Sequence, residues 1–376
     1  MVSRIAVLGG GHGGHALAAH LSLAGFKVNL YDLPQFAGGL FGETLKRKEI
    51  ELLGKCGEGT IRINKVTTDI SEALSDVEVV IVSVPAFGHK TFAEVCAPHL
   101  KKKRGEVKTV VVMAGDAGSL EFYKIFKEAG IHLPVSETAT LPYGCRLIGP
   151  AKVMIYVTAK MLPTGVIPAE KTESIVDLLK ELYKTTVPCK NVIEAAINNP
   201  NMVTHPAATL LNVGRIEYAK GEFWLYKEGI TPSVARIYDA IDAEREAVCK
   251  VLGLKIFECG EPLTEMDRVI RMGLLFGARC WEEAGLKMKG PSSVRDRFVT
   301  EDVPYGLVFV SSLADMIGVP TPVIKAIITL FSVINQTDYF KEGRTVEKLG
   351  IAGLSIQELN EYLTKGYLTK SGTYSS

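Results

Sequence analysis

The sequence lacks an excess of charge of either sign. Its 376 residues include 43 lysines and arginines against 42 acidic residues, which leaves a formal net charge of +1. Binding to nucleic acid or to an anionic membrane surface needs a strongly basic field, and this chain does not carry one. We therefore expect small-molecule partners, with no nucleic acid and no membrane among them.

Cysteine is also scarce, and long apolar runs are missing. The seven cysteines are scattered and odd in number, and no two form a CxxC pair. This argues against a disulfide framework, and the sequence predicts no metal site. Nothing before the first expected strand resembles a signal peptide, and charges and prolines interrupt the best apolar stretch, residues 311–334. We expect a cytoplasmic protein with reduced thiols.

What the sequence does contain is a glycine-rich turn between an apolar strand and a helix. Gly9, Gly11 and Gly14 form a G-x-G-x-x-G pattern directly after the strand expected at residues 5–8. The first glycine makes a tight turn, the second lets the backbone approach a pyrophosphate, and the third lets helix and strand pack closely. Unpaired N–H groups at the helix N-terminus then bind the phosphates. The pattern predicts a dinucleotide site.

Three further residues complete this predicted cofactor site. His12 and Gly13 lie inside the loop, and we expect the His12 side chain to face solvent or phosphate. Asp32 ends the second strand, 23 residues after Gly9, where an acid accepts hydrogen bonds from the adenosine ribose. A carboxylate there repels a 2′-phosphate, so NAD(H) is favoured. The basic residues 46–48 could still reach such a phosphate, which keeps NADP(H) open.

Strand and helix patterns continue to alternate through the first half. We expect Val84 and Pro85, and then residues 113–118, to follow two parallel strands and to line the nicotinamide side. A simple strand terminator is the alternative role of Pro85. Residues 131–137 and 151–160 read as further strands. Repeated strand–helix units predict a Rossmann domain with a doubly wound, mostly parallel sheet.

Helical periodicity replaces this alternation near residue 190. Helices are expected at residues 231–253, 303–318 and 321–334, with proline or threonine starts. We therefore predict a dinucleotide-binding domain at residues 1–188 and an all-α catalytic domain at 189–376. Substrates are expected in the cleft between them.

Two segments of the second half carry the candidate chemistry. "NNPNMVTHPAATLLNVG" places His205 after a turn and before an apolar helix, where a structural or capping histidine is the alternative. "SSVRDRFVTEDVPYG" gathers four charged residues before another helix: Arg295, Arg297, Glu301 and Asp302. A helix cap explains Asp302 alone. It does not explain two arginines in the same segment.

Together with "GGGHGGHALA" and "GRTVEKLGIAGLS", these segments resemble the opine dehydrogenase family over nearly the whole chain. The resemblance implies coupling of an amino acid to an α-keto acid and reduction of the imine with NAD(P)H. It implies that His205 is the acid/base, that Asp302 orients it, and that Arg297 binds the keto-acid carboxylate. It does not fix the amino acid.

The chemistry of the residues agrees with this resemblance. Imine formation needs a proton shuttle that works near neutral pH, as histidine does, and we expect the neighbouring carboxylate to favour imidazolium. Both substrates carry carboxylates, which Arg297 can bind through two parallel hydrogen bonds. Arg146, in "YGCRLIG", is a second candidate, with a surface ion pair as its alternative role.

Two other functions stay open at this point. One is a dehydrogenase of the same architecture that acts on a hydroxy acid or a phosphorylated alcohol. The other is a cofactor-binding sensor without turnover. The sequence also leaves open the two substrates, the product stereochemistry, and the choice between monomer and homodimer.

Overall fold

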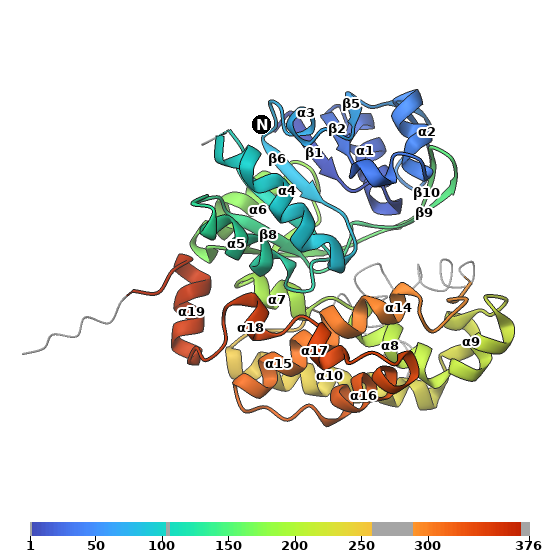
Figure 1. Cartoon of the computed structure of the whole chain (residues 1–376), viewed down its shortest axis with the longest axis vertical. Helices are drawn as coiled ribbons and strands as arrows, with labels where there is room; N and C mark the ends of the chain where they lie inside the picture. Colours follow the sequence, from blue (N-terminus) through green and yellow to red (C-terminus); the bar gives the residue numbers. More distant parts are fainter. Residues whose placement is uncertain (1, 103–105, 258–288, 370–376) are drawn as a thin grey trace, which may run out of the picture.

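The computed structural model describes residues 2–102, 106–257 and 289–369. The N-terminal half forms an α/β domain in the upper part of Figure 1, and most of the C-terminal half forms a group of helices below it. The predicted fold class, a Rossmann domain followed by a helical domain, is therefore confirmed.

An eight-stranded sheet forms the centre of the first domain, in the order β12-β11-β8-β7-β6-β1-β2-β5. All neighbouring strands are parallel except β8 and β11. The strands are β1 (Arg4–Leu8), β2 (Lys27–Tyr31), β5 (Lys65–Thr67), β6 (Val79–Val82), β7 (Thr109–Met113), β8 (Val135–Thr138), β11 (Leu162–Ile167) and β12 (Thr186–Pro188).

Both faces of this sheet are covered, which explains its continuous apolar strands. Along β1, Ile5 and Val7 pack into one hydrophobic core, whereas Ala6 and Leu8 pack into the other. The covering helices and short 3₁₀ turns are α1 (His12–Leu23), η1 (Pro34–Phe36), α2 (Leu40–Arg47), α3 (Ile70–Ala73), η2 (Ala86–Gly88), α4 (His89–Lys102), α5 (Gly118–Glu128), η3 (Ala169–Lys171) and α6 (Thr172–Lys180). A strand buried on both faces needs apolar residues at every position.

A second sheet was not expected from the sequence. It has the order β4-β3-β10-β9 and contains β3 (Glu49–Gly54), β4 (Gly59–Arg62), β9 (Tyr143–Gly149) and β10 (Lys152–Thr158). The assignment of residues 151–160 to the main sheet was therefore wrong. A tight turn in which Ala151 has φ +51° folds β10 back onto β9, and the residues of β10 alternate between buried and half-buried. Such alternation is typical of a sheet with only one buried face.

The helical domain follows β12. Its elements are α7 (Val192–Ile197), α8 (Asn201–Leu211), α9 (Val213–Ala219), η4 (Leu225–Gly229), α10 (Pro232–Leu252), α14 (Arg297–Thr300), η5 (Asp302–Leu307), α15 (Val308–Met316), α16 (Pro322–Asn335), α17 (Tyr339–Glu342), α18 (Val346–Leu349) and α19 (Ile356–Lys365). Both η4 and η5 are π-helical turns. The start of α10 is capped by Thr231 and its end by Gly253, as predicted. The helix expected from residue 303 instead begins as η5.

The two halves are joined by more than one connection. Helix α7 packs against β8 and β11, and α19 packs against β11 and η3. In Figure 1, α19 lies at the left, where the α/β domain meets the helices below it. The domain boundary between residues 188 and 189 stays a prediction, because α7 and α19, which follow it in the sequence, also pack against the sheet. Among the helices in the described ranges, none is both long and apolar enough to span a membrane.

Candidate active site

The glycine loop has the shape that a dinucleotide requires. Gly9 has φ +110°, and a Cβ there would collide with the carbonyl oxygen of Ser83. A Cβ at Gly14 would collide with the backbone of Gly9, whereas a Cβ at Gly11 would meet no described atom within 4 Å. Two glycines are thus required by packing, but Gly11 borders open space at the N-terminus of α1. That space and the unpaired N–H groups beside it fit a pyrophosphate.

Asp32 lies directly beside this loop, at the end of β2. Its Oδ2 accepts a hydrogen bond from the Gly10 N–H at 2.9 Å, and its Oδ1 accepts one from the Leu33 N–H at 2.8 Å. Burial raises the pKa of this carboxyl group. The basic residues considered for a 2′-phosphate lie on or just after α2, where Arg47 contacts Glu43 at 2.8 Å.

The structure corrects the expectation for His12. Its ring faces the second sheet, because Nδ1 accepts a hydrogen bond from the Leu147 N–H of β9 at 3.0 Å. Burial, together with the cations of Arg146 and Arg297, lowers the pKa of His12 to about 4. The ring is therefore neutral and turned toward protein instead of solvent or phosphate. Its backbone still belongs to the loop.

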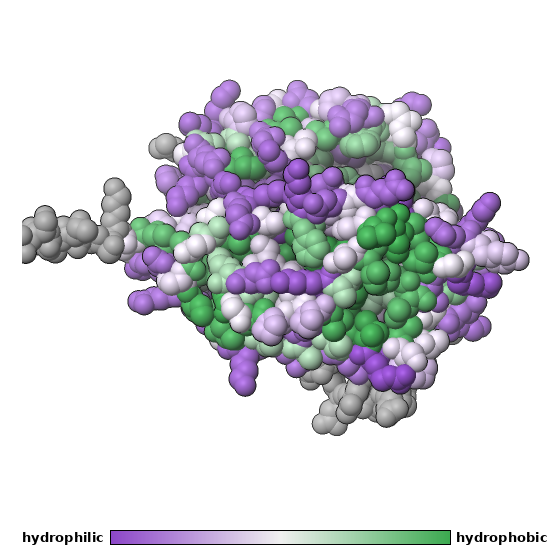
Figure 2. Space-filling view, turned by 60° about the horizontal axis from the view of Figure 1, so that its bottom comes forward, coloured by the Kyte–Doolittle hydropathy of each residue, from purple (hydrophilic) through white to green (hydrophobic). Residues whose placement is uncertain are grey.

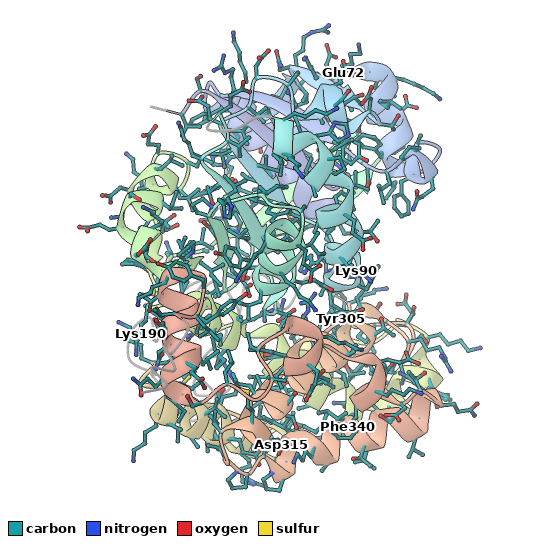
Figure 3. All side chains as sticks on the ribbon, turned by 60° about the vertical axis from the view of Figure 1, so that its left-hand side comes forward. Glu72, Lys90, Lys190, Tyr305, Asp315 and Phe340 are labelled. Atoms are coloured by element: carbon teal, nitrogen blue, oxygen red, sulfur yellow. The ribbon has the colours of Figure 1, made fainter. Side chains whose placement is uncertain are left out.

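Val84 and Pro85 follow β6, and the segment 114–117 follows the adjacent strand β7, so both lie at the same sheet edge. A buried arginine of the second half, Arg344, ties these two segments together. It donates hydrogen bonds to the carbonyl oxygens of Ala86, Gly115 and Asp116, at 3.1, 3.0 and 2.7 Å. The guanidinium carbon of Arg344 lies 4.9 Å from the centroid of the Tyr305 ring. Figure 3 labels Tyr305 where the helical half meets the α/β half.

His205 and Asp302, which the resemblance pairs, do lie together. The Nδ1 atom of His205, on α8, lies 2.8 Å from Oδ2 of Asp302, at the start of η5. Its Nε2 lies 2.9 Å from the Tyr226 hydroxyl of η4, and the Phe298 ring stacks on the imidazole at 3.7 Å. Each ring nitrogen thus has a partner, and the ring plane is held from one side.

The charge of this pair differs from the expectation. Burial and the Arg146 cation lower the pKa of His205 to about 3, and burial raises the pKa of Asp302 well above its usual range. Both shifts favour a neutral ring over the imidazolium expected from the sequence. A neutral ring with its proton on Nδ1 donates to Asp302 and accepts from Tyr226.

The two candidate arginines belong to different domains, and the charge of each acts on His205. Arg297 begins α14, and its Nε and Nη2 atoms lie 2.7 and 2.6 Å from Oε2 of Glu301. Its side chain is nevertheless 58% exposed. Arg146 is exposed on β9, and its positive charge adds to the burial that lowers the pKa of His205. Two cations therefore act on the same histidine.

The chain is similar to known proteins over most of its length. The family model described as "NAD/NADP octopine/nopaline dehydrogenase, alpha-helical domain" matches residues 188–335. The chain is 34% identical to an opine dehydrogenase of Arthrobacter sp. (strain 1C), over 93% of this chain and 96% of that protein. It is 24% identical to an opine dehydrogenase of Haliotis discus hannai, over 86% of this chain and 88% of that one.

Solved structures show the same fold. An octopine dehydrogenase with NADH and L-arginine superposes with a TM-score of 0.72 at 20% identity, covering 98% of this chain and all of that one. Yersinopine dehydrogenase superposes with a TM-score of 0.73 at 15% identity, covering 96% and 98%. The 34% identity over almost the whole length decides the family. The chain belongs to the opine dehydrogenases, a family of NAD(P)-dependent oxidoreductases.

Proposed function

We propose that this enzyme condenses the amino group of an amino acid with an α-keto acid and reduces the resulting imine with NAD(H), while His205 moves the protons. The observation that carries the proposal is the contact between His205 and Asp302, together with the charges of Arg146 and Arg297 that act on His205. Two carboxylate substrates and a proton shuttle require this combination of groups.

Arg297 binds the carboxylate of the keto acid. Glu301 occupies the edge of the guanidinium formed by Nε and Nη2. The fork formed by Nη1 and the second hydrogen of Nη2 points away from Glu301, and it matches the two oxygens of a carboxylate. Arg146 binds the carboxylate of the amino acid from the opposite domain. With two anchored carboxylates, the amine and the carbonyl are brought together in one orientation.

A neutral His205 is the form that can start the reaction. It accepts a proton from the ammonium group of the amino acid, and the free amine then attacks the carbonyl carbon. The imidazolium, stabilised by Asp302, returns the proton to the hydroxyl of the carbinolamine, which leaves as water. The nicotinamide, when bound, supplies the hydride that reduces the imine. The Tyr226 hydroxyl contacts Nε2 of His205. The substrate amine therefore displaces this hydroxyl to reach the imidazole ring.

Asp32 makes NAD(H) the favoured cofactor. Its carboxylate is fixed by the Gly10 and Leu33 N–H groups beside the predicted ribose position. A 2′-phosphate there would meet a buried acid, which costs more than any gain from the exposed basic residues of α2. The glycine loop, Val84 and Pro85 complete the proposed site.

The direct test combines each of a set of amino acids with each of a set of α-keto acids. For every pair, the oxidation of NADH and of NADPH is measured. Our proposal requires that oxidation depend on both substrates and that NADH be preferred. Oxidation with the keto acid alone would instead identify a hydroxy-acid dehydrogenase. Cofactor binding without oxidation for any pair would identify a sensor.

We also keep a cytoplasmic homodimer as a prediction. Figure 2, which brings the helical half forward, shows hydrophobic side chains gathered on one face. Helix α16 exposes Leu330 and Val333, by 50% and 71%. Apolar surface of this kind is typical of contact sites. Analytical ultracentrifugation of the purified enzyme distinguishes a homodimer from a monomer.

A further inference from the structure

Glu301 connects the keto-acid arginine with the nicotinamide edge of the sheet. Its Oε1 accepts a hydrogen bond from the Ala86 N–H at 2.8 Å, and its Oε2 accepts from Nε and Nη2 of Arg297, at 2.7 and 2.6 Å. Ala86 directly follows Pro85 in η2, and 215 positions of sequence separate it from Glu301. One carboxylate therefore spans both domains.

The surroundings give this bridge a fixed geometry. Glu301 is only 8% exposed, and it lies at the junction of α14 and η5, one residue before Asp302. The side chain of Arg297, by contrast, is 58% exposed. A long exposed side chain loses rotamer freedom only where a partner holds it. Glu301 is such a partner, and it is itself held by the backbone of the other domain.

We propose that Glu301 is a positioning residue, which sets the distance between Arg297 and the nicotinamide edge and so aligns the keto-acid carbonyl for reduction. This inference rests on the proposed function, because it acts through the carboxylate-binding role of Arg297. A displacement of about 1 Å in such an anchor can lower a rate by about 10²-fold. Glu301 therefore contributes to the rate without contacting the substrate.

The chemistry of the bridge requires two acceptor atoms. Both neighbours of Glu301, the Ala86 N–H and the Arg297 guanidinium, are donors. A glutamine offers one acceptor oxygen and one NH₂ donor, so it must place a donor against one of these two groups. Glu301→Gln therefore breaks the bridge although its size is unchanged.

The test compares pyruvate kinetics of Glu301→Gln and the wild type, with the amino acid that gives the fastest NADH oxidation. We expect kcat/KM for pyruvate to fall about 10- to 100-fold, the loss expected for a hydrogen bond to a charged group. The Kd for NADH, measured by fluorescence, should change less than about threefold, because Glu301 does not contact the glycine loop. In an Arg297→Ala background, Glu301→Gln should change kcat/KM less than about threefold, since it acts through Arg297.

Glu244 provides a matched control. Its carboxylate accepts hydrogen bonds from the Val323 and Ile324 N–H groups at 2.7 and 3.0 Å, at the start of α16. Glu244→Gln should lower the Tm and leave kcat/KM for pyruvate within about twofold of the wild type, because only stability is affected.

Three results would overturn the inference. If Glu301→Gln keeps normal kcat/KM while Arg297→Ala is strongly impaired, Glu301 has no positioning role and the proposed function stands. If the loss of kcat/KM in the double variant equals the product of the two single losses, Glu301 acts independently of Arg297. If Arg297→Ala itself leaves pyruvate kinetics unchanged, the carboxylate-binding role of Arg297 falls as well, and the inference falls with it.

Discussion

The imidazole Nδ1 of His205 and the carboxyl Oδ2 of Asp302 lie within hydrogen-bonding distance, 2.8 Å apart, although 97 positions of sequence separate the two residues. His205 comes from α8, and Asp302 begins a π-helical turn. Phe298, one turn earlier, stacks on the ring. The segment 296–307 therefore holds the histidine by a hydrogen bond and by ring stacking, and it also carries Arg297. This explains how one short segment can serve both proton transfer and substrate binding.

The glycine loop yields a contrast between two substitutions. Gly11→Ala should leave the free energy of unfolding within about 1 kcal/mol of the wild type, because the added methyl group meets open space. It should weaken NADH binding, because that methyl group occupies the space proposed for the pyrophosphate. Gly14→Ala should lower the stability by about 1–3 kcal/mol, because its methyl group collides with the Gly9 backbone.

Chemical denaturation and NADH titration of both variants check this prediction. Equal NADH affinity of Gly11→Ala and the wild type would show that the space beside α1 is not the phosphate site.

Much of this architecture could be predicted from the sequence, because the decisive signals are local. The strand, the glycine turn and Asp32 lie within 30 residues of one another, and their spacing alone indicates a dinucleotide site. The pairing of His205 with Asp302 could not be derived in this way. It followed only from the family resemblance, since no periodicity connects α8 with η5.

Other features depend on contacts that the sequence does not encode locally. The second sheet pairs β3 with β10 across about a hundred residues, so the orientation of His12 toward β9 could not be foreseen. Tyr226 lies on a π-helical turn without amphipathic spacing. Arg344 acts on backbone carbonyl groups, which every sequence contains. The segment "GRTVEKLGIAGLS", which contains Arg344, indicated the protein family, but it did not indicate which groups Arg344 contacts.

Asp32 should determine the choice of cofactor. Asp32→Ala is expected to weaken NADH binding. It should also raise kcat/KM for NADPH relative to that for NADH, because the acid that repels a 2′-phosphate is gone. The ratio of kcat/KM for the two cofactors measures this effect. A ratio identical to that of the wild type would assign Asp32 only to the support of Gly10.

The pH dependence of the reaction should respond to Arg146. Burial and the Arg146 cation lower the pKa of His205 to about 3. In our proposal the neutral ring is the form that starts the reaction. Activity should therefore decline as the pH falls toward the pKa of His205. Arg146→Ala removes a positive charge, raises that pKa and moves the acid limb of kcat/KM to higher pH.

The same variant should raise the KM for the amino acid more than the KM for pyruvate. A pH profile that overlays that of the wild type would place Arg146 too far from His205 to act on it. Equal effects on both KM values would remove its assignment to the amino-acid carboxylate.

The most direct measurement of the central claim is the turnover of His205→Ala per NADH-binding site, with pyruvate and the best amino acid. We predict a loss of about 10²–10⁴-fold in kcat while NADH binding persists, as for removal of a general acid/base. Asp302→Asn should also lower kcat, and the double variant should be much less impaired than the product of the two losses, because the pair acts as one unit. Turnover per site close to that of the wild type in His205→Ala would contradict the account, and would leave His205 as a structural residue of α8.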